Sequence, residues 1–153
     1  MAGIRLHVRV DDEQAQDALQ AVMQRMSDPR PAFRDAGEYM QRVVDDRFRG
    51  EHDPDGQPWQ DLAPLTWTKK RNDKILTERG GPGLRGSIHY RTSRTALEQG
   101  TDKIYAAIHQ LGGIIRTRNA QIQIPARQYL GFSDGNAAEV SRILYRHAFE
   151  RRR

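Results

Sequence analysis

The chain has 153 residues and a formal net charge of +5, which is long enough to bury one hydrophobic core. Hydrophobic residues make up 37% of it and charged residues 29%, and no stretch approaches the length and apolarity of a membrane span. The lack of cysteine excludes disulfides and thiolate metal sites, and the alternating N-terminus argues against a signal peptide.

The first fifty residues predict a strand and two helices. Apolar residues alternate from Ile4 to Val10, which is typical of a half-buried strand. A helix is then expected from Asp11 or Asp12 to the proline-rich residues 27–31, with one apolar stripe: Ala15, Ala18, Leu19, Val22, Met23 and Met26. A second helix is expected over about residues 32–49, with a buried side of Phe33, Ala36, Met40, Val43, Val44 and Phe48. We expect the methionines at 23, 26 and 40 to lie in the core.

The middle of the chain has little periodicity. Residues 51–67 contain three prolines, and Trp59 and Trp67 are expected to pin them as an ordered loop, because an indole ring offers a large burial area and an N–H donor that needs a partner. A short basic helix is expected at residues 66–72, and a flexible glycine-rich break at residues 80–83.

Three short antiparallel strands are expected next, at residues 87–91, 95–99 and 103–109. Gly112 and Gly113 end them, and residues 114–117 and 121–124 predict a hairpin over Arg118 and Asn119. A last helix is expected after residues 133–136, with Asn136 and Glu139 spaced as a capping box. The sequence thus predicts one α+β domain over residues 1–153: a mostly antiparallel sheet with two N-terminal helices and a C-terminal helix packed on it, and a projecting hairpin at about 114–124.

Residues that carry chemistry are sparse. The best metal candidate is residues 51–56, where Glu51, Asp53 and Asp55 precede Gly56, yet the terminal glutamate of an EF-hand is missing because position 64 is proline. The histidines form no helical ligand pair, and no serine lies in a nucleophile elbow. We therefore expect no enzyme, no catalytic residue and no cofactor, and keep a metal or carboxylate site at residues 51–55 as a third hypothesis.

Arginine clusters raise the alternative of a nucleic-acid-binding protein. Arg116 and Arg118 lie on the expected hairpin, and Arg151, Arg152 and Arg153 end the chain. Such clusters neutralise phosphates and give salt-dependent binding. Aromatic interleaving of the kind that stacks on bases is absent, and a solvated helix end explains the C-terminal cations equally well.

Several motifs in fixed order make the chain resemble the phage virion morphogenesis family. The segments that carry the resemblance run from about residue 32 to 143: Pro54-Asp55-Gly56 with Trp59 and Leu62, Gly83-Leu84 with Ser87-Ile88, Tyr105-Ala106 with Ile108-His109-Gln110 and Gly112-Gly113, and Ile124-Pro125-Ala126-Arg127 with Tyr129-Leu130-Gly131. Each motif is weak alone, whereas their order and spacing together are specific.

The resemblance implies a structural protein that completes the tail or joins head to tail, as a ring subunit at the head-proximal end of the tail. The implied partners are other copies of itself in a ring, hexameric in the virion, the head–tail connector, and tail-tube or tail-terminator proteins. The implied location is the virion neck or tail, assembled in the bacterial host cytoplasm, with passing contact to phage DNA and none to a membrane. On this basis we expect partner contacts from Arg116, Arg118, Arg127, Tyr129, Trp59 and Trp67, and DNA-facing side chains at Arg116, Arg118, Arg151, Arg152 and Arg153.

Overall fold

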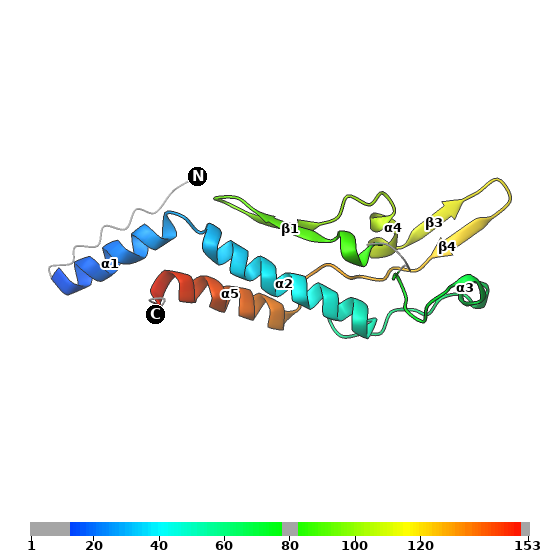
Figure 1. The fold of residues 1–153 in the computed structure, drawn as a ribbon, viewed down its shortest axis with the longest axis horizontal. Coiled ribbons are helices and arrows are strands. Elements are labelled where there is room, and N and C mark those ends of the chain that lie inside the picture. The colour runs from blue at the N-terminus through cyan, green and yellow to red at the C-terminus, as the bar shows by residue number, and fades with distance from the viewer. Residues whose placement is uncertain (1–12, 78–82, 151–153) are drawn as a thin grey trace, which may run out of the picture.

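The computed structural model describes residues 13–77 and 83–150, which form an elongated α+β body (Figure 1). The fold class is thus as predicted. The helices are α1 (Glu13–Met26), α2 (Arg30–Gly50), α3 (Pro64–Lys69), α4 (Ala106–Leu111) and α5 (Asp134–Phe149), with a 3-10 turn at Arg85–Ser87. The strands are β1 (His89–Thr92), β2 (Leu97–Gly100), β3 (Gly113–Arg116) and β4 (Gln121–Ile124). The strand expected at residues 4–10, and residues 80–82 of the expected break, lie outside the described residues.

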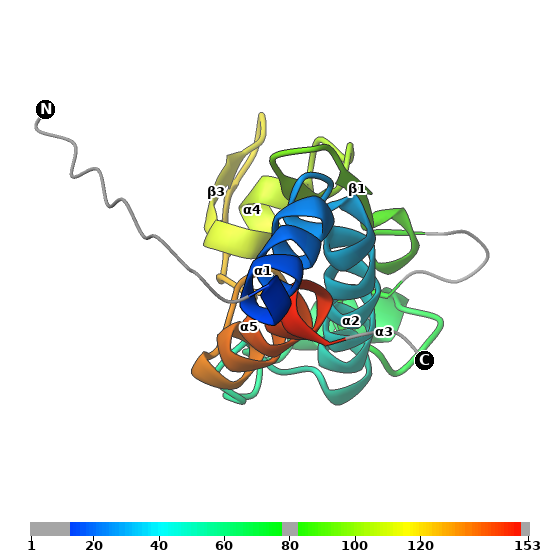
Figure 2. The same ribbon diagram turned by 90° about the vertical axis from the view of Figure 1, so that its left-hand side faces the viewer.

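Helix α2 is the central element. Its buried apolar residues follow a strict four-residue spacing, which places them on one face: Ala32, Ala36, Met40, Val44 and Phe48. Pro29 and Pro31 begin the helix, and Glu51 ends it in the left-handed region with φ 55°. The β1–β2 ribbon packs on one side of α2 and α5 on the other, as Figure 2 shows in end view.

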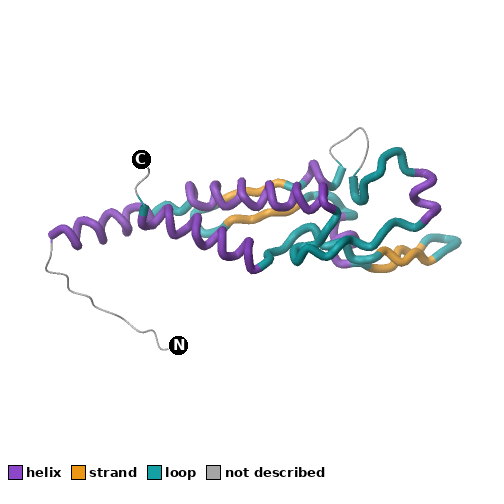
Figure 3. The backbone as a smooth tube through the Cα atoms, turned by 90° about the horizontal axis from the view of Figure 1, so that it is seen from below, coloured by secondary structure: helices purple, strands orange, loops and turns teal. Residues whose placement is uncertain are grey.

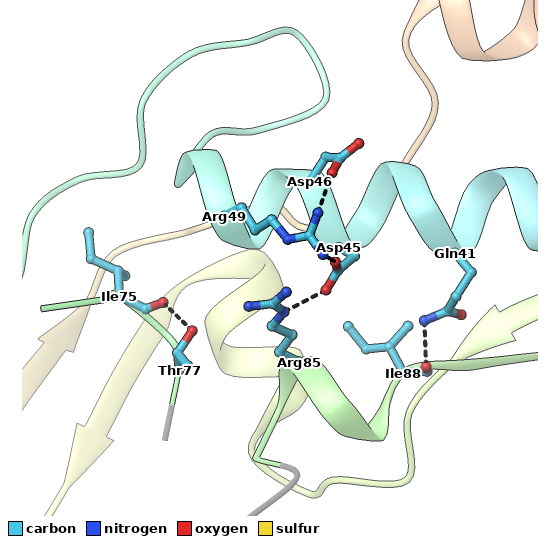
Figure 4. Close-up of polar contacts among 8 residues, drawn as sticks. All are labelled: Gln41, Asp45, Asp46, Arg49, Ile75, Thr77, Arg85 and Ile88. Carbon is cyan, nitrogen blue, oxygen red and sulfur yellow. Dashed lines mark hydrogen bonds and ion pairs between the residues drawn. The ribbon is translucent and has the colours of Figure 1, made fainter. Parts of the chain in front are cut away.

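The β1–β2 ribbon lies very close to α2. A Cβ atom added at Gly37 would overlap the ring of Tyr90, so only glycine permits this approach. Polar contacts hold the same side (Figure 4): the amide of Gln41 donates to the carbonyl of Ile88 at 2.9 Å, and the carboxylate of Asp45 accepts from Arg85 Nε at 2.5 Å. The hydrogen bond from Arg85 lowers the pKa of Asp45. These contacts fix the segment that leads into β1.

An aromatic cluster closes the other end of α2. The ring of Phe48 meets Trp59 edge-on and Tyr129 at a tilt, both with centroids 5.4 Å apart. The indole N–H of Trp59 donates to the carbonyl of Gln128 at 3.0 Å, and that of Trp67 donates to Asp61 Oδ1 at 2.8 Å. Both tryptophans therefore pin the loop as predicted, each through the partner that an indole N–H requires.

The expected third strand at residues 103–109 is wrong, because Ala106–Leu111 is helix α4. The alternation of Ile104 and Ala106 suggested one buried face, yet Ile104 is 98% exposed and Ala106 only 7%. A helical turn instead brings Ala106 and Gln110 to one face, where both contact the chain at residues 129–130. In the described residues the strands form two separate two-stranded antiparallel ribbons, β1–β2 and β3–β4.

Two local predictions about the helices also need correction. No residue of α1 is buried, and Met23 (65% exposed) and Met26 (53%) lie on the surface, whereas Met40 lies in the core as expected. The capping box of α5 is formed by Ser133 and Asn136 rather than by Asn136 and Glu139. The backbone N–H of Asn136 donates to Ser133 Oγ and that of Ser133 donates to Asn136 Oδ1.

Candidate assembly surface

The β3–β4 hairpin projects beyond the rest of the molecule (Figure 3). The two strands pair as the predicted hairpin over Arg118 and Asn119, and their register pairs Ile115 with Ile122 and Arg116 with Gln121. The turn is closed by Thr117, whose N–H donates to the carbonyl of Ala120 at 2.8 Å. Every residue from 114 to 123 is exposed. Arg116 and Arg118 therefore reach solvent on an element that no other segment of residues 13–77 and 83–150 covers.

Two glycines form the root of the hairpin. Gly112 has φ +74°, and a Cβ atom there would lie 2.8 Å from the backbone nitrogen of Ala126. A side chain at this position would be strained and would collide with main chain that has no freedom to rotate away. Gly113 follows directly and packs against the side chain of Ile108. The hairpin thus leaves the body at a fixed point.

Residues 125–131, which we call the strap, run from the hairpin back to α5 without pairing as a strand. Arg127 donates from Nε to the carbonyl of Gln60 at 2.8 Å and from Nη2 to that of Asp61 at 3.0 Å. Its own backbone N–H donates to the carbonyl of His109 at 2.7 Å. The strap is therefore joined to the loop before α3 by side-chain hydrogen bonds and to α4 by a backbone hydrogen bond.

Because the strap does not pair as a strand, the side chain of Gln110 makes the hydrogen bonds that a neighbouring strand would otherwise make. Its Oε1 accepts from the N–H groups of Tyr129 and Leu130, both at 3.0 Å, and its Nε2 donates to the carbonyl of Leu130 at 2.9 Å. The hydroxyl of Tyr129 donates to the carbonyl of Ala106 at 2.9 Å. Burial raises the pKa of Tyr129 to about 12.

Arg47 joins the strap to both long helices. Its Nη1 donates to the carbonyls of Tyr129 and Gly131 at 3.0 and 2.9 Å, and its Nη2 donates to Asn136 Oδ1 at 2.7 Å. The side chain is 2% exposed. Burial lowers the pKa of both Arg47 and Arg127. Each guanidinium donates to carbonyl oxygens of its own subunit. These hydrogen bonds compensate for the burial of its positive charge.

The sequence interpretation missed Arg47, although a signal was present. Position 47 lies three residues after Val44 and seven after Met40, so it falls on the buried face of α2. A charged side chain at such a position indicates a buried hydrogen-bond network. Gln110 had no comparable signal, because its partners at Tyr129 and Leu130 lie on a distant segment.

The structure separates the expected contact residues into two groups. Arg116 and Arg118 are exposed on the hairpin, whereas Arg127, Tyr129 and Trp59 are at most 7% exposed and bond within the subunit. Trp67 is partly buried against the core. A buried side chain has little surface to offer a partner, so Arg127, Tyr129 and Trp59 hold the strap in place, whereas Arg116 and Arg118 face solvent. The contact of these residues with a partner stays a prediction.

The carboxylates of the metal hypothesis accept hydrogen bonds from backbone N–H groups. Glu51 Oε1 accepts from the N–H of Ile75 at 2.6 Å, and Asp53 Oδ1 accepts from the N–H groups of Asp55 and Gln57. These are turn and loop contacts. Across the ranges 13–77 and 83–150, no group of three histidine, aspartate or glutamate side chains is placed to hold a metal ion.

The arginines of the nucleic-acid hypothesis do not form one patch in the described chain. Arg116 and Arg118 lie at the hairpin end of the molecule, and the C-terminal end of α5 lies toward the other end (Figures 1 and 3). Arg142 and Arg146 both pair with Glu139. Arg151, Arg152 and Arg153 fall outside the described residues.

Comparison with known proteins identifies relatives by sequence. The sequence profile of the phage virion morphogenesis family matches residues 10–148. A curated relative, "Mu-like prophage FluMu G protein 1" of Haemophilus influenzae, is 28% identical over 127 residues, which cover 80% of this chain and 82% of the relative. No solved structure matches. Of the helices in the described residues, none is long and apolar enough to cross a membrane.

Proposed function

The chain belongs to the phage virion morphogenesis family, a family of virion structural or assembly proteins, and we propose that it completes the tail or joins head to tail as a ring subunit at the neck. In this proposal the partners are further copies of the chain, hexameric in the virion, together with the head–tail connector and the tail-tube or tail-terminator proteins. The site of action is the head-proximal end of the tail, after assembly in the host cytoplasm.

The family match over residues 10–148 carries the proposal. The geometry supports it, because the subunit has a rigid body and one projecting element. The strap, Arg47 and Gln110 fix the hairpin root, while residues 114–123 remain exposed. A preorganised projecting element is what docking to a partner requires, since little ordering entropy is lost on contact.

The exposed Arg116 and Arg118 support a second candidate, direct contact with DNA. Two cations give only a small salt dependence, since each neutralised phosphate contributes about one unit of slope. Gel shifts of the full chain with duplex DNA across a salt series discriminate the two. Binding that weakens with salt at a log–log slope of about two supports DNA contact through these two arginines, and the lack of any shift at low salt removes it.

A gene disruption tests the assembly role. A phage genome with this gene disrupted is expected to yield filled heads and tails that do not join, visible by negative-stain electron microscopy. Plasmid-borne wild-type protein is expected to restore infectious particles. Normal joined particles from the disrupted genome would contradict the proposal.

A further inference from the structure

Strand β2 has a free outer edge. Within residues 13–77 and 83–150, the backbone groups of Leu97–Gly100 are paired with β1 alone. A strand at the edge of a sheet presents a row of unpaired N–H and C=O groups, which is a template for one more strand. Leu97 and Gln99 are partly buried on the side of β2 that faces α2, and Glu98 is exposed on the other side.

An apolar cavity lies beside this edge. It has a volume of about 140 Å³ and lies between Met40 of α2, Leu97 of β2, Leu130 of the strap and the adjoining Phe132. The side chain of Phe132 is 60% exposed. An apolar cavity of about 150 Å³ accommodates a molecule of the size of benzene, so one aliphatic side chain fits here. The edge and the cavity together suit an added strand with aliphatic side chains on one face.

The outer edge of β1 borders a groove of different chemistry. Asp45, Asp46, Arg49 and Arg85 line this groove next to β1 (Figure 4). Aliphatic side chains placed there would remove charged groups from water, which costs free energy. Of the two edges of the ribbon, β2 is therefore the one that suits an apolar strand.

Residues 4–10, which lie outside the described residues, carry the matching sequence pattern. Aliphatic and basic side chains alternate along them: Ile4, Arg5, Leu6, His7, Val8, Arg9 and Val10. On a strand this alternation gives one aliphatic face and one basic face. With the aliphatic face over the cavity, the basic face lies on the side of Glu98. Glu98 pairs with Arg91 and remains 64% exposed, so its carboxylate is accessible to a second cation, and opposite charges on neighbouring strands stabilise the pairing.

The segment of the same chain is too short to reach β2. His7, at the middle of residues 4–10, lies six positions before Glu13, and six extended residues span at most about 21 Å. Helix α1 itself has 14 residues, a length of about 21 Å, and it extends beyond the ribbon, away from α2 (Figure 1). The cavity beside β2 lies at Gly37, about two turns into α2. The added strand therefore comes from a second copy.

We propose that residues 4–10 of one copy add to β2 of a second copy as a third strand. Their backbone pairs with the outer edge of Leu97–Gly100, and one aliphatic side chain fills the cavity beside Met40 and Phe132. A basic side chain lies beside Glu98. The contact is head-to-tail, and repeating it from copy to copy closes a ring. The inference rests on the proposed ring and names one contact between its subunits.

Because the chain has no cysteine, paired cysteine substitutions report this contact. The full chain is prepared with His7→Cys and Glu98→Cys together, both on the outward face of the proposed sheet, and treated with a short bismaleimide as concentrated protein and in purified particles. A ladder of covalent multimers is expected on denaturing gels. The matched control pairs His7→Cys with Asp46→Cys, an exposed position in the groove beside β1, and is expected to give no ladder.

The alternation of the segment provides a second measurement on the same double-cysteine chain. Leu6→Asn with Val8→Asn is expected to lower the multimer yield about tenfold, because two buried aliphatic side chains are lost. Arg5→Asn with Arg9→Asn changes as many residues on the other face and is expected to lower the yield about threefold at most, because exposed charge pairs contribute little. Equal effects of the two pairs would overturn the inference. Circular dichroism checks that each variant keeps its helices.

The remaining outcomes separate this inference from the proposed function. A crosslink within one chain, which migrates as a monomer of altered mobility, would overturn the inference. No ladder in either preparation, a ladder equal to that of the Asp46→Cys control, or crosslinks to a different virion protein would also overturn it. An immunoblot of purified particles tests the virion role independently. Protein present in particles without a ladder removes only the inference, whereas a ladder from protein that is absent from particles removes only the virion role.

Discussion

Arg47 Nη2 donates to Asn136 Oδ1 at 2.7 Å and so joins the last turn of α2 to the first turn of α5. Asn136 in turn donates from Nδ2 to the hydroxyl of Tyr39 at 3.0 Å and caps α5 through Ser133. Arg47 and Asn136 thus belong to one hydrogen-bond network that runs from α2 across the strap to α5. This network holds α2, the strap and α5 together.

The first prediction concerns Arg47. Substitution Arg47→Met removes three hydrogen bonds from a charged donor and leaves buried carbonyl groups without a partner, so the free energy of unfolding is expected to fall by about 3 kcal/mol or more. Urea denaturation followed by circular dichroism measures this. The exposed Arg34 on the same helix provides the matched control, Arg34→Met, with a change expected within about 0.5 kcal/mol.

The second prediction separates fold from assembly. Arg127→Ala is expected to lower the thermal midpoint of the isolated subunit, because Arg127 bonds the strap to the carbonyls of Gln60 and Asp61. Arg118→Ala, on the exposed hairpin, is expected to leave the midpoint unchanged and to reduce the yield of joined particles. An unchanged midpoint for Arg127→Ala combined with failed joining would instead assign Arg127 to a partner contact.

The third prediction is a pH dependence. Burial raises the pKa of Tyr129 from 10.0 to about 12, so its stabilising effect is fully present below pH 10 and is lost as the pH rises toward 12. Between these values the free energy of unfolding is expected to fall by about 1.4 kcal/mol per pH unit. Tyr129→Phe is expected to flatten that slope, and Tyr145→Phe, at an exposed position (59%), is expected to leave it as it is.

The fourth prediction concerns the root of the hairpin. Gly112→Ala is expected to cost about 1–3 kcal/mol of stability, because φ is +74° and the new Cβ would lie 2.8 Å from the nitrogen of Ala126. Gly100→Ala provides the control, since nothing lies within 4 Å of a Cβ atom there. Equal stability of the two variants in thermal denaturation would show that the root does not need glycine.

The sequence predicted the elements whose pattern is local. The four-residue spacing from Met40 to Phe48 determined α2, and the residues flanking Arg118 and Asn119 determined the hairpin and its position. It misled where a short pattern fits two structures: Ile104, Ala106 and Ile108 alternate as in a strand, yet the chain turns as a helix there. A run of six residues is too short to distinguish the two periods.

The candidate site was predictable only in part. The hairpin arginines were placed correctly on an exposed element, because polar residues at a turn face water. The strap was expected to carry contact residues, and the structure shows Arg127 and Tyr129 bonded inside the subunit. That distinction depends on which distant carbonyl groups come within reach, at Gln60 and Ala106, and no pattern along the chain records those distances.

The central claim is that this chain is a ring subunit at the neck of a tailed phage. An electron cryomicroscopy reconstruction of the head–tail junction of purified particles tests it most directly. The account predicts a ring at the head-proximal end of the tail into which α2, α5 and the strap fit as one rigid unit. Density for this chain in the capsid or the distal tail, or none in the joined particle, would contradict it.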